Sequence, residues 1–318
     1  MARTQPKGSP RSARPAAGRG RPARGRPPAR GRLYRNALWL SLAAVVVAVA
    51  VVVMASGGGD SHQPAAATSS SKGLVGGDFH SLVVDPVTPT RLFVGGHEVV
   101  STSSDGGRTW SRVASLDGAD AMGWSFTANA VYVSGHPGIR RSTDGAASFS
   151  PANAGLPDTD VHAFGAGRST LYAAGPSNGV IASTDGGRTW QTRTNDAGQA
   201  FFGRILAGPD DDQHLIAADA RAGAAESTDG GRTWHGLGGP PSALWVSRAG
   251  TNLYVSGPEG AGRSADGGKT WQKFVLPKGA SLVEADPTDL NLLYAGIHDG
   301  NAVQVMVSRD GGARWQRP

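Results

Sequence analysis

The sequence contains no cysteine, and this removes several classes of site at once. Without a thiol the chain has no disulfide scaffold, no zinc-thiolate site, no cysteine nucleophile and no lipobox for lipid attachment. Any bound metal must therefore use histidine, carboxylate or methionine ligands. A long helical architecture is also disfavoured, because 47 glycines and 20 prolines interrupt the 318 residues. The composition favours a turn-rich fold.

Acidic side chains are absent from the first 35 residues, which hold 11 of the 31 Lys and Arg residues. The formal net charge of +6 comes from this tail, because the remaining residues carry 20 basic and 25 acidic side chains. A basic surface for nucleic acid is therefore not expected on the folded part. The tail also has too few large apolar side chains to form a core, so we expect residues 1–36 to be disordered.

Only one long apolar run is present, at residues 37–55, where Ser41 is the single polar residue. A helix of this length spans about 28 Å, close to the ~30 Å hydrocarbon core of a bilayer. Because the arginines precede the run, we expect a single-pass cell-membrane protein with a cytoplasmic N-terminus and an extracytoplasmic remainder. The alternative is a signal peptide cleaved near Ala55, which would release a secreted protein. The Gly, Ser, Ala and Thr in residues 56–77 are typical of a flexible linker.

An eight-residue phrase recurs six times in the rest of the chain. The copies are SSDGGRTW at Ser103–Trp110, STDGAASF at Ser142–Phe149, STDGGRTW at Ser183–Trp190, STDGGRTW at Ser227–Trp234, SADGGKTW at Ser264–Trp271 and SRDGGARW at Ser308–Trp315. The aspartate carboxylate can accept backbone N–H bonds in a tight turn, and the glycines can adopt positive φ. The aromatic residue that ends the phrase is predicted to pack between neighbouring units. These structural positions are Asp105, Asp144, Asp185, Asp229, Asp266 and Asp310, with Trp110, Trp190, Trp234, Trp271 and Trp315.

The spacing of the repeat predicts the fold. The aspartates are 37 to 44 residues apart, which fits four short strands with their turns. Each unit also has an upstream strand pattern, such as RLFVGG or AVYVSG. We therefore predict an all-β fold, a monomeric six-bladed β-propeller over residues 78–318. The ring closes either by packing of blade against blade or by a strand near Leu74 that pairs with the last blade.

The repeated phrase resembles the Asp-box (BNR) repeat, found in bacterial sialidases, sortilin-type receptors, xyloglucan hydrolases and photosystem assembly propellers. The resemblance covers about three quarters of the chain, and six copies make it specific for the fold but not for the function. DAMGW at Asp120–Trp124 and SGHPG at Ser134–Gly138 are similar to segments of exported bacterial propellers described as glycosyl-hydrolase-like. If the propeller is an enzyme, the resemblance implies a glycoside hydrolase.

One end of the predicted propeller collects most of the histidines. The start of the first strand and the end of the second strand of an antiparallel blade lie at the same face, which we call the mouth. Histidines occupy these positions in the first three blades, and acids and a methionine lie beside them. Zinc suits imidazole with carboxylate, and participation of a methionine favours copper. The candidate metal ligands are His80, His97, Met122, His136 and His162, although polar residues are also common at strand ends without any ligand.

Catalytic residues are less clearly marked. A sialidase needs three convergent arginines, a tyrosine nucleophile and paired acids. The chain lacks the expected early arginine motif, and four of its tyrosines occupy one repeated strand position that indicates packing. The remaining candidates at the mouth are the acids Glu98, Asp120, Glu259 and Asp299 and the substrate-binding arginines Arg204 and Arg221.

The sequence alone leaves three functions open. The first is a noncatalytic binding or scaffold module that holds a glycan, a peptide or a protein outside the membrane. The second is a glycoside hydrolase, either sialidase-like or another exo-glycosidase. The third is a metal-binding protein that uses the histidines of the mouth to hold zinc or copper.

Overall fold

The computed structural model describes residues 70–198 and 200–318. Apart from one 3-10 turn, η1 (Ala114–Leu116), the regular structure in these residues is β-strand, so the all-β prediction is confirmed for this part of the chain. The predicted tail, the predicted membrane helix and most of the predicted linker lie outside the described residues. Within the described ranges, no helix has the length and apolar character needed to cross a membrane.

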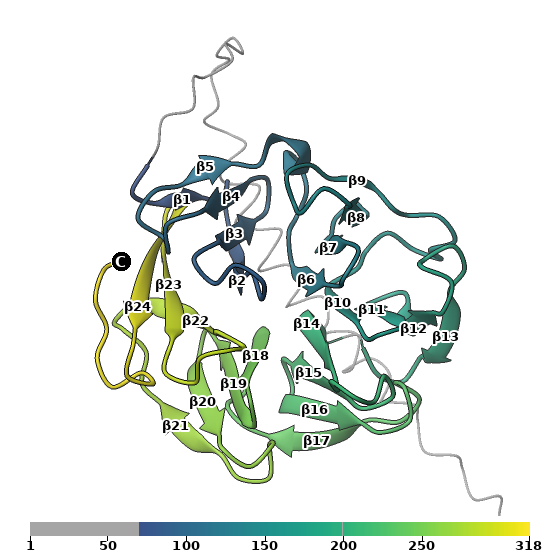
Figure 1. Cartoon of the computed structure of the whole chain (residues 1–318). Helices are drawn as coiled ribbons and strands as arrows, with labels where there is room; N and C mark the ends of the chain where they lie inside the picture. Colours follow the sequence, from purple (N-terminus) through teal and green to yellow (C-terminus); the bar gives the residue numbers. More distant parts are fainter. Residues whose placement is uncertain (1–69, 199) are drawn as a thin grey trace, which may run out of the picture. The chain divides into compact units, whose positions relative to one another are not determined.

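The first three blades follow the predicted order of four antiparallel strands each, arranged around a ring (Figure 1). Blade 1 contains β2 (Phe79–Val84), β3 (Leu92–Gly96), β4 (Val100–Ser103) and β5 (Ser111–Arg112). Blade 2 contains β6 (Gly123–Phe126), β7 (Val131–Gly135), β8 (Gly138–Ser142) and β9 (Ser150–Pro151). Blade 3 contains β10 (Ala163–Ala166), β11 (Leu171–Gly175), β12 (Gly179–Ser183) and β13 (Gln191–Thr194).

The other three blades continue the ring. Blade 4 contains β14 (Phe201–Ala207), β15 (Leu215–Asp219), β16 (Gly223–Ser227) and β17 (His235–Gly238). Blade 5 contains β18 (Trp245–Ala249), β19 (Asn252–Gly257), β20 (Gly260–Ser264) and β21 (Gln272–Phe274). Blade 6 contains β22 (Ala280–Ala285), β23 (Leu293–Asp299), β24 (Ala302–Ser308) and, as its outer strand, β1 (Gly73–Leu74). Blades 3 and 4 are joined into one sheet because β10 and β14 pair in parallel, with Ala163 opposite Gly203.

Strand β1 closes the ring by pairing with β24, so the second of the two predicted closures is confirmed. Gly73 lies opposite Val303, and Leu74 lies opposite Ala302. The Val75 N–H donates to the Asn301 carbonyl at 2.8 Å, and the Val75 side chain is fully buried. Residues 73–74 fall inside the range 56–77 that was predicted to be a flexible linker, so the last part of that range belongs to the propeller.

The six Asp-box turns share one hydrogen-bond pattern. In each turn the serine two residues before the aspartate donates its hydroxyl to the carboxylate, at 2.7 or 2.8 Å. Backbone N–H groups three and four residues further on also donate to this carboxylate, for example those of Arg108 and Thr109 to Asp105. In the second copy the hydroxyl of Ser148 takes the place of the usual threonine and donates to Asp144. The serine and aspartate side chains of the phrase thus accept hydrogen bonds from the backbone N–H groups of the turn in which they lie.

Replacing Asp105 by asparagine is expected to lower the melting temperature at pH 7 by about 2–4 °C and to have little effect near pH 2. Slight burial acts to raise the pKa of Asp105, but the bonds from Thr109, Ser103 and Arg108 outweigh it and lower this pKa to about 2. The stabilisation from a lowered carboxyl pKa is present above the unfolded pKa, near pH 4, and is lost as the pH falls toward 2. Thermal unfolding between pH 2 and 7 measures the effect, with the exposed Asp210 changed to asparagine as the control. An equal loss at both ends of the pH range would contradict the explanation.

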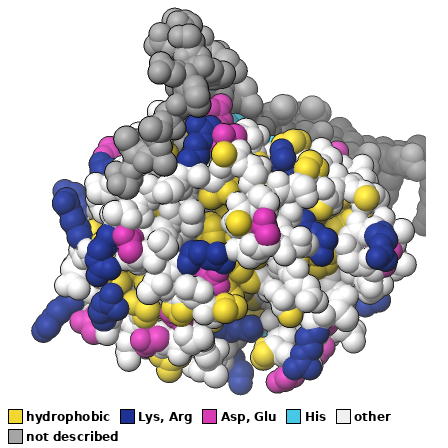
Figure 2. Space-filling model, turned by 45° about the horizontal axis from the view of Figure 1, so that its top comes forward, with side chains coloured by type: hydrophobic (Ala, Val, Ile, Leu, Met, Phe, Trp, Pro, Cys, Tyr) yellow, Lys and Arg dark blue, Asp and Glu magenta, His cyan; other side chains and the backbone are white. Residues whose placement is uncertain are grey.

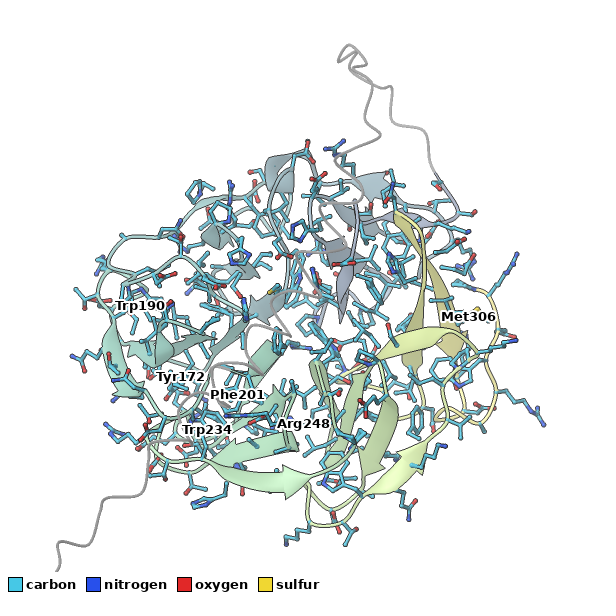
Figure 3. The ribbon with its side chains drawn as sticks, turned by 180° about the vertical axis from the view of Figure 1, so that it is seen from behind. Tyr172, Trp190, Phe201, Trp234, Arg248 and Met306 are labelled. Carbon is cyan, nitrogen blue, oxygen red and sulfur yellow. The ribbon has the colours of Figure 1, made fainter. Side chains whose placement is uncertain are left out.

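Aromatic residues at the ends of the Asp boxes pack against the spaces between blades. Trp110 is buried in a cluster with Leu92 of blade 1 and Val303 of blade 6. The Trp234 ring lies 4.6 Å from the ring of Phe201, beside a cluster shared by blades 3 and 4 (Figure 3). Each repeat therefore stabilises its neighbour as well as its own turn.

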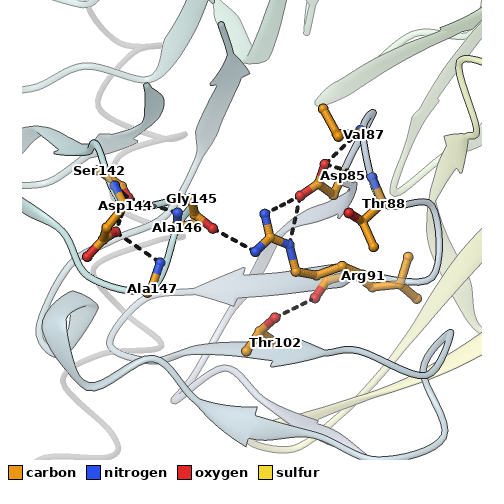
Figure 4. Close-up of polar contacts among 11 residues, drawn as sticks. Asp85, Val87, Thr88, Arg91, Thr102, Ser142, Asp144, Gly145, Ala146 and Ala147 are labelled. Carbon is orange, nitrogen blue, oxygen red and sulfur yellow. Dashed lines mark hydrogen bonds and ion pairs between the residues drawn. The ribbon is translucent and has the colours of Figure 1, made fainter. Parts of the chain in front are cut away.

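Polar contacts also join neighbouring blades at the turn between the first two strands. Arg91 binds the carboxylate of Asp85 in its own turn and donates from Nη1 to the Gly145 carbonyl in the Asp box of blade 2, at 2.6 Å (Figure 4).

Charged side chains of both signs are interspersed over the face of the propeller in Figure 2. The described residues on that face therefore form no broad region of one charge.

Candidate metal centre

The structure brings together six side chains from blades 1, 2 and 3 at the mouth. His80 lies near the start of β2, and His97 directly follows β3; His136 directly follows β7, and His162 directly precedes β10. These are four of the five predicted metal ligands. Two carboxylates lie among them, Asp120 before β6 and Asp160 before β10, and we call the complete set the histidine cluster: His80, His97, Asp120, His136, Asp160 and His162.

Backbone hydrogen bonds between blades hold the loops that carry the histidine cluster. The Asp120 N–H donates to the His136 carbonyl at 2.8 Å, and the Ala121 N–H donates across to Gly96 of blade 1 at 3.0 Å. A glycine is required at position 135, because a Cβ there would lie 1.6 Å from the Asp120 carbonyl oxygen. The strand endings VGG and VSG therefore allow the segment that precedes the first strand of the same blade to approach closely, since a Cβ at Gly96 would likewise lie 2.1 Å from the Asp78 carbonyl oxygen.

One half of the histidine cluster, the first triad, consists of His80, His97 and Asp120. Its potential ligand atoms all lie within 4.8 Å of one another. The His80 Nε2 is 3.2 Å from Asp120 Oδ1, and the His97 Nδ1 is 3.7 Å from Asp120 Oδ2. The Asp120 side chain is only 3% exposed, yet among the described residues neither of its oxygens accepts a hydrogen bond of normal geometry. A buried carboxylate is costly without a compensating charge, so Asp120 depends on a protonated imidazole or on a bound cation beside it.

The other half, the second triad, consists of His136, Asp160 and His162, which also lie within 4.8 Å of one another. The Nε2 atoms of His136 and His162 are each 2.7 Å from Asp160 Oδ1. Both rings thus converge on one carboxylate oxygen, but this oxygen too has no hydrogen bond of normal geometry. The His162 ring stacks on Phe202 with 5.0 Å between ring centroids, which fixes its orientation.

The protonation of the cluster follows from its carboxylates and its burial. Asp120 and Asp160 raise the pKa of His136 to about 10, against the opposing effect of partial burial. Burial lowers the pKa of His80 and outweighs the nearby carboxylates of Asp120 and Asp78. Burial acts to raise the pKa of Asp160, but His136 and His162 lower it below the usual range. Neutral imidazole at His80 is the form that binds a metal ion.

A pocket of about 360 Å³ opens beside the first triad. Glu98, Arg112 and Pro137 form part of its wall together with His97, Asp120 and His136. Two of the predicted catalytic acids, Glu98 and Asp120, therefore share this pocket. Arg112 was not among the predicted site residues, because it follows an Asp-box tryptophan and has no distinguishing motif around it.

Other predicted site residues have different surroundings. Met122 is half-buried two residues after Asp120, and its N–H donates to the Ser134 carbonyl. Glu259 accepts a hydrogen bond from Ser242, and Asp299 forms an ion pair with Lys72. His298, which was not among the candidate ligands, contacts the Gly77 carbonyl through Nε2 at 2.8 Å, beside the closing strand.

The two predicted substrate-binding arginines are both paired with acids. Arg204 donates to Glu284 at 2.8 Å, and Arg221 lies 3.3 Å from Asp219. Arg204 is 20% exposed, whereas Glu284 is 1% exposed and also accepts a bond from the Trp245 indole. Arg204 therefore neutralises a buried carboxylate of blade 6.

The donor set of the histidine cluster fits a first-row transition metal. Ligands on a tetrahedral zinc at about 2.0–2.1 Å lie roughly 3.3 Å apart, and the nitrogen–oxygen separations within the two triads, 2.7 to 3.7 Å, bracket that value. Imidazole nitrogen and carboxylate oxygen suit zinc and copper, and the buried oxygens of Asp120 lack other partners. The ligand types and their grouping thus fit a transition-metal ion.

No protein-family model matches the chain, and no curated protein sequence matches it. Solved structures do resemble it. A GH74 enzyme from Niastella koreensis aligns with a TM-score of 0.50 at 19% identity, over 74% of this chain and 37% of the enzyme. A GH74 xyloglucanase from Xanthomonas campestris aligns with a TM-score of 0.53 at 15% identity, over 79% of this chain and 47% of the enzyme. The chain spans less than half the length of either enzyme.

A YCF48 protein solved with a D1 peptide also aligns, with a TM-score of 0.49 at 17% identity, over 81% of this chain and 86% of that protein. The resemblance to sialidases implied by the Asp boxes stays a prediction. The likeness to the GH74 enzymes concerns the fold alone, and it shows that this chain is a β-propeller.

Proposed function

We propose that this propeller is a binding module for a divalent transition metal, zinc or copper, at the histidine cluster. The observation that carries the proposal is Asp120, a carboxylate that is almost completely buried, faces three imidazoles and has no hydrogen-bond partner of normal geometry in the part of the chain that the structure describes. A cation is the group that such a carboxylate requires.

The composition of the cluster supports a transition metal over calcium or magnesium. Calcium and magnesium prefer sets of oxygen ligands, and here four imidazoles accompany two carboxylates. The alternative is a network of imidazolium and carboxylate groups without metal, in which protonated His136 neutralises both acids. The two arrangements differ in metal content, in metal affinity and in their response to chelators.

The test is metal analysis of the full chain, purified without a polyhistidine tag. Mass spectrometry of the purified protein, followed by calorimetric titration of chelator-treated protein with Zn²⁺ or Cu²⁺, gives the stoichiometry and the affinity. We expect tight binding that Asp120→Asn weakens by at least about 100-fold, because this change removes the central anionic ligand and keeps its shape.

His214→Ala is the matched control, because His214 also contacts a carboxylate, that of Glu226 at 2.7 Å, but belongs to blade 4. Its affinity for metal should equal that of the unchanged protein. Protein that contains no metal and does not bind added zinc or copper would overturn the proposal. Equal loss of binding in Asp120→Asn and His214→Ala would also contradict it.

A further inference from the structure

The ring of His136 lies between the two triads and presents one nitrogen to each. Its Nδ1 is 3.4 Å from Asp120 Oδ2 in the first triad, and its Nε2 is 2.7 Å from Asp160 Oδ1 in the second. The two nitrogens of an imidazole point out of opposite edges of the ring, so a single side chain can serve two ions at once. The triads are therefore connected parts of one centre.

The surroundings of His136 hold its ring in this position. The His136 carbonyl accepts from Asp120, and the neighbouring Gly135 carbonyl accepts from Val161 of blade 3 at 3.2 Å. The His162 ring meets the His136 ring edge to face, with 5.7 Å between centroids. Contacts from blades 2 and 3 thus orient the ring toward both carboxylates.

We propose that the mouth holds two divalent ions, one in each triad, and that His136 links them through its two ring nitrogens. This inference rests on the proposed metal-binding function. The first ion has His80, His97 and Asp120 as ligands, and the Nδ1 of His136, 3.4 Å from Asp120 Oδ2, faces the same carboxylate as its fourth ligand. When His136 bridges, both of its ring nitrogens bind metal and its protons pass to solvent.

The second ion has fewer protein ligands, because among the described residues Asp160, His162 and the Nε2 of His136 are the ones grouped around it. Three protein ligands leave one position of a tetrahedral ion for water or for an external ligand. The first triad is built around a carboxylate that is 3% exposed, whereas Asp160 in the second triad is 29% exposed. The carboxylate of the first ion is thus buried, whereas the second ion keeps a coordination position that is open to exchange.

The test begins with the stoichiometry of the unchanged full chain. We expect two ions per chain, and we expect the copper-loaded protein to lose electron paramagnetic resonance intensity because the spins of two ions couple through the imidazole. One ion per chain would overturn the two-ion inference and leave the proposed metal binding intact. No bound ion would overturn both.

Variants then assign the ions to the triads. His162→Ala should weaken one binding step and keep the ion of the first triad, and His97→Ala should weaken the other step and keep the ion of the second triad. His136→Gln should weaken both steps and abolish the spin coupling, and because His136 is 48% exposed this variant should fold as the unchanged protein does. Circular dichroism and thermal unfolding check the fold of each variant. Retention of coupling in folded His136→Gln would overturn the linking role.

Discussion

Replacing Arg204 by alanine is expected to lower the free energy of unfolding by about 3–5 kcal/mol at neutral pH. Arg204 in β14 reaches across to Glu284 in β22, whose carboxylate is 1% exposed and also accepts from the Trp245 indole. Three of the innermost strands, those of blades 4, 5 and 6, are thus joined at one acid. Without the guanidinium, the folded protein must bury an uncompensated negative charge.

The pH dependence of this loss identifies its cause. Burial raises the pKa of Glu284, and Arg204 counteracts this rise. In Arg204→Ala the folded state binds the Glu284 proton more tightly than the unfolded state does, so the stability of the variant improves as the pH falls from neutral toward the ordinary pKa of a glutamate. The deficit measured by urea unfolding should therefore be largest at neutral pH and smaller in mild acid.

Two further variants control the Arg204 experiment. Arg221→Ala removes a half-exposed guanidinium from an ion pair with Asp219 and should cost no more than about 1 kcal/mol. The double variant Arg204→Met/Glu284→Gln removes both charges and should recover most of the lost stability. If the double variant were no more stable than Arg204→Ala, the buried-charge explanation would be wrong.

Replacing Val75 by aspartate is expected to cost more than about 3 kcal/mol, because it removes a buried apolar side chain and places a charge in the core. Val75 follows the closing strand β1 and is 0% exposed, packed in the cluster that joins blades 1 and 6. Detachment of β1 would also expose the edge of β24 and favour aggregation. Urea unfolding gives the free energy, and hydrogen exchange of the β24 amides reports the closure directly.

Leu74→Asp is the matched control for Val75→Asp. Leu74 is the neighbouring residue, but its side chain points outward and is 47% exposed. This variant should keep nearly full stability and protected β24 amides. Similar losses in the two variants would indicate that the closing strand contributes little to the ring.

The blades could be predicted from the sequence because their signals are local. Each Asp box contains its own turn, and the serine, the aspartate and the N–H groups that it joins lie within a few residues. The closure is different, because Leu74 pairs with Ala302 far along the chain and only two residues form the strand. A strand of two residues has no hydrophobic periodicity of its own. From the sequence, pairing of this strand was therefore one of two possible closures, the other being packing of blade against blade.

The candidate site was predictable in part for a similar reason. Strand starts and strand ends share one edge of an antiparallel blade, which places His80, His97, His136 and His162 on the same rim without further information. The same rule applies to His298 near the end of β23, yet its ring contacts Gly77 and lies outside both triads. Which histidines of the rim come into contact depends on how neighbouring blades pack, and the order of residues in the sequence does not specify this packing.

The pairing of Arg204 could not be foreseen from its position in the sequence. This arginine was predicted to bind substrate because its strand starts at the mouth, but it pairs with Glu284 inside the ring. The available signal was Glu284 itself, an acid within the apolar strand ASLVEA, where a buried charge requires a basic partner. The partner could not be identified, because Arg248 occupies a comparable position on the innermost strand of blade 5.

The closing strand also sets an order for folding during synthesis. The partner of Leu74 is Ala302, so a segment made at the start of the propeller must wait for about 230 further residues before it can pair. At roughly 5–20 residues per second, this interval lasts about ten to fifty seconds. Throughout that time blade 1 lacks the neighbour that covers Trp110 and Val75. Until the last blade is synthesised, the nascent propeller is an open arc whose first blade exposes an apolar edge. A chaperone that recognises apolar surface is expected to bind at this edge of blade 1.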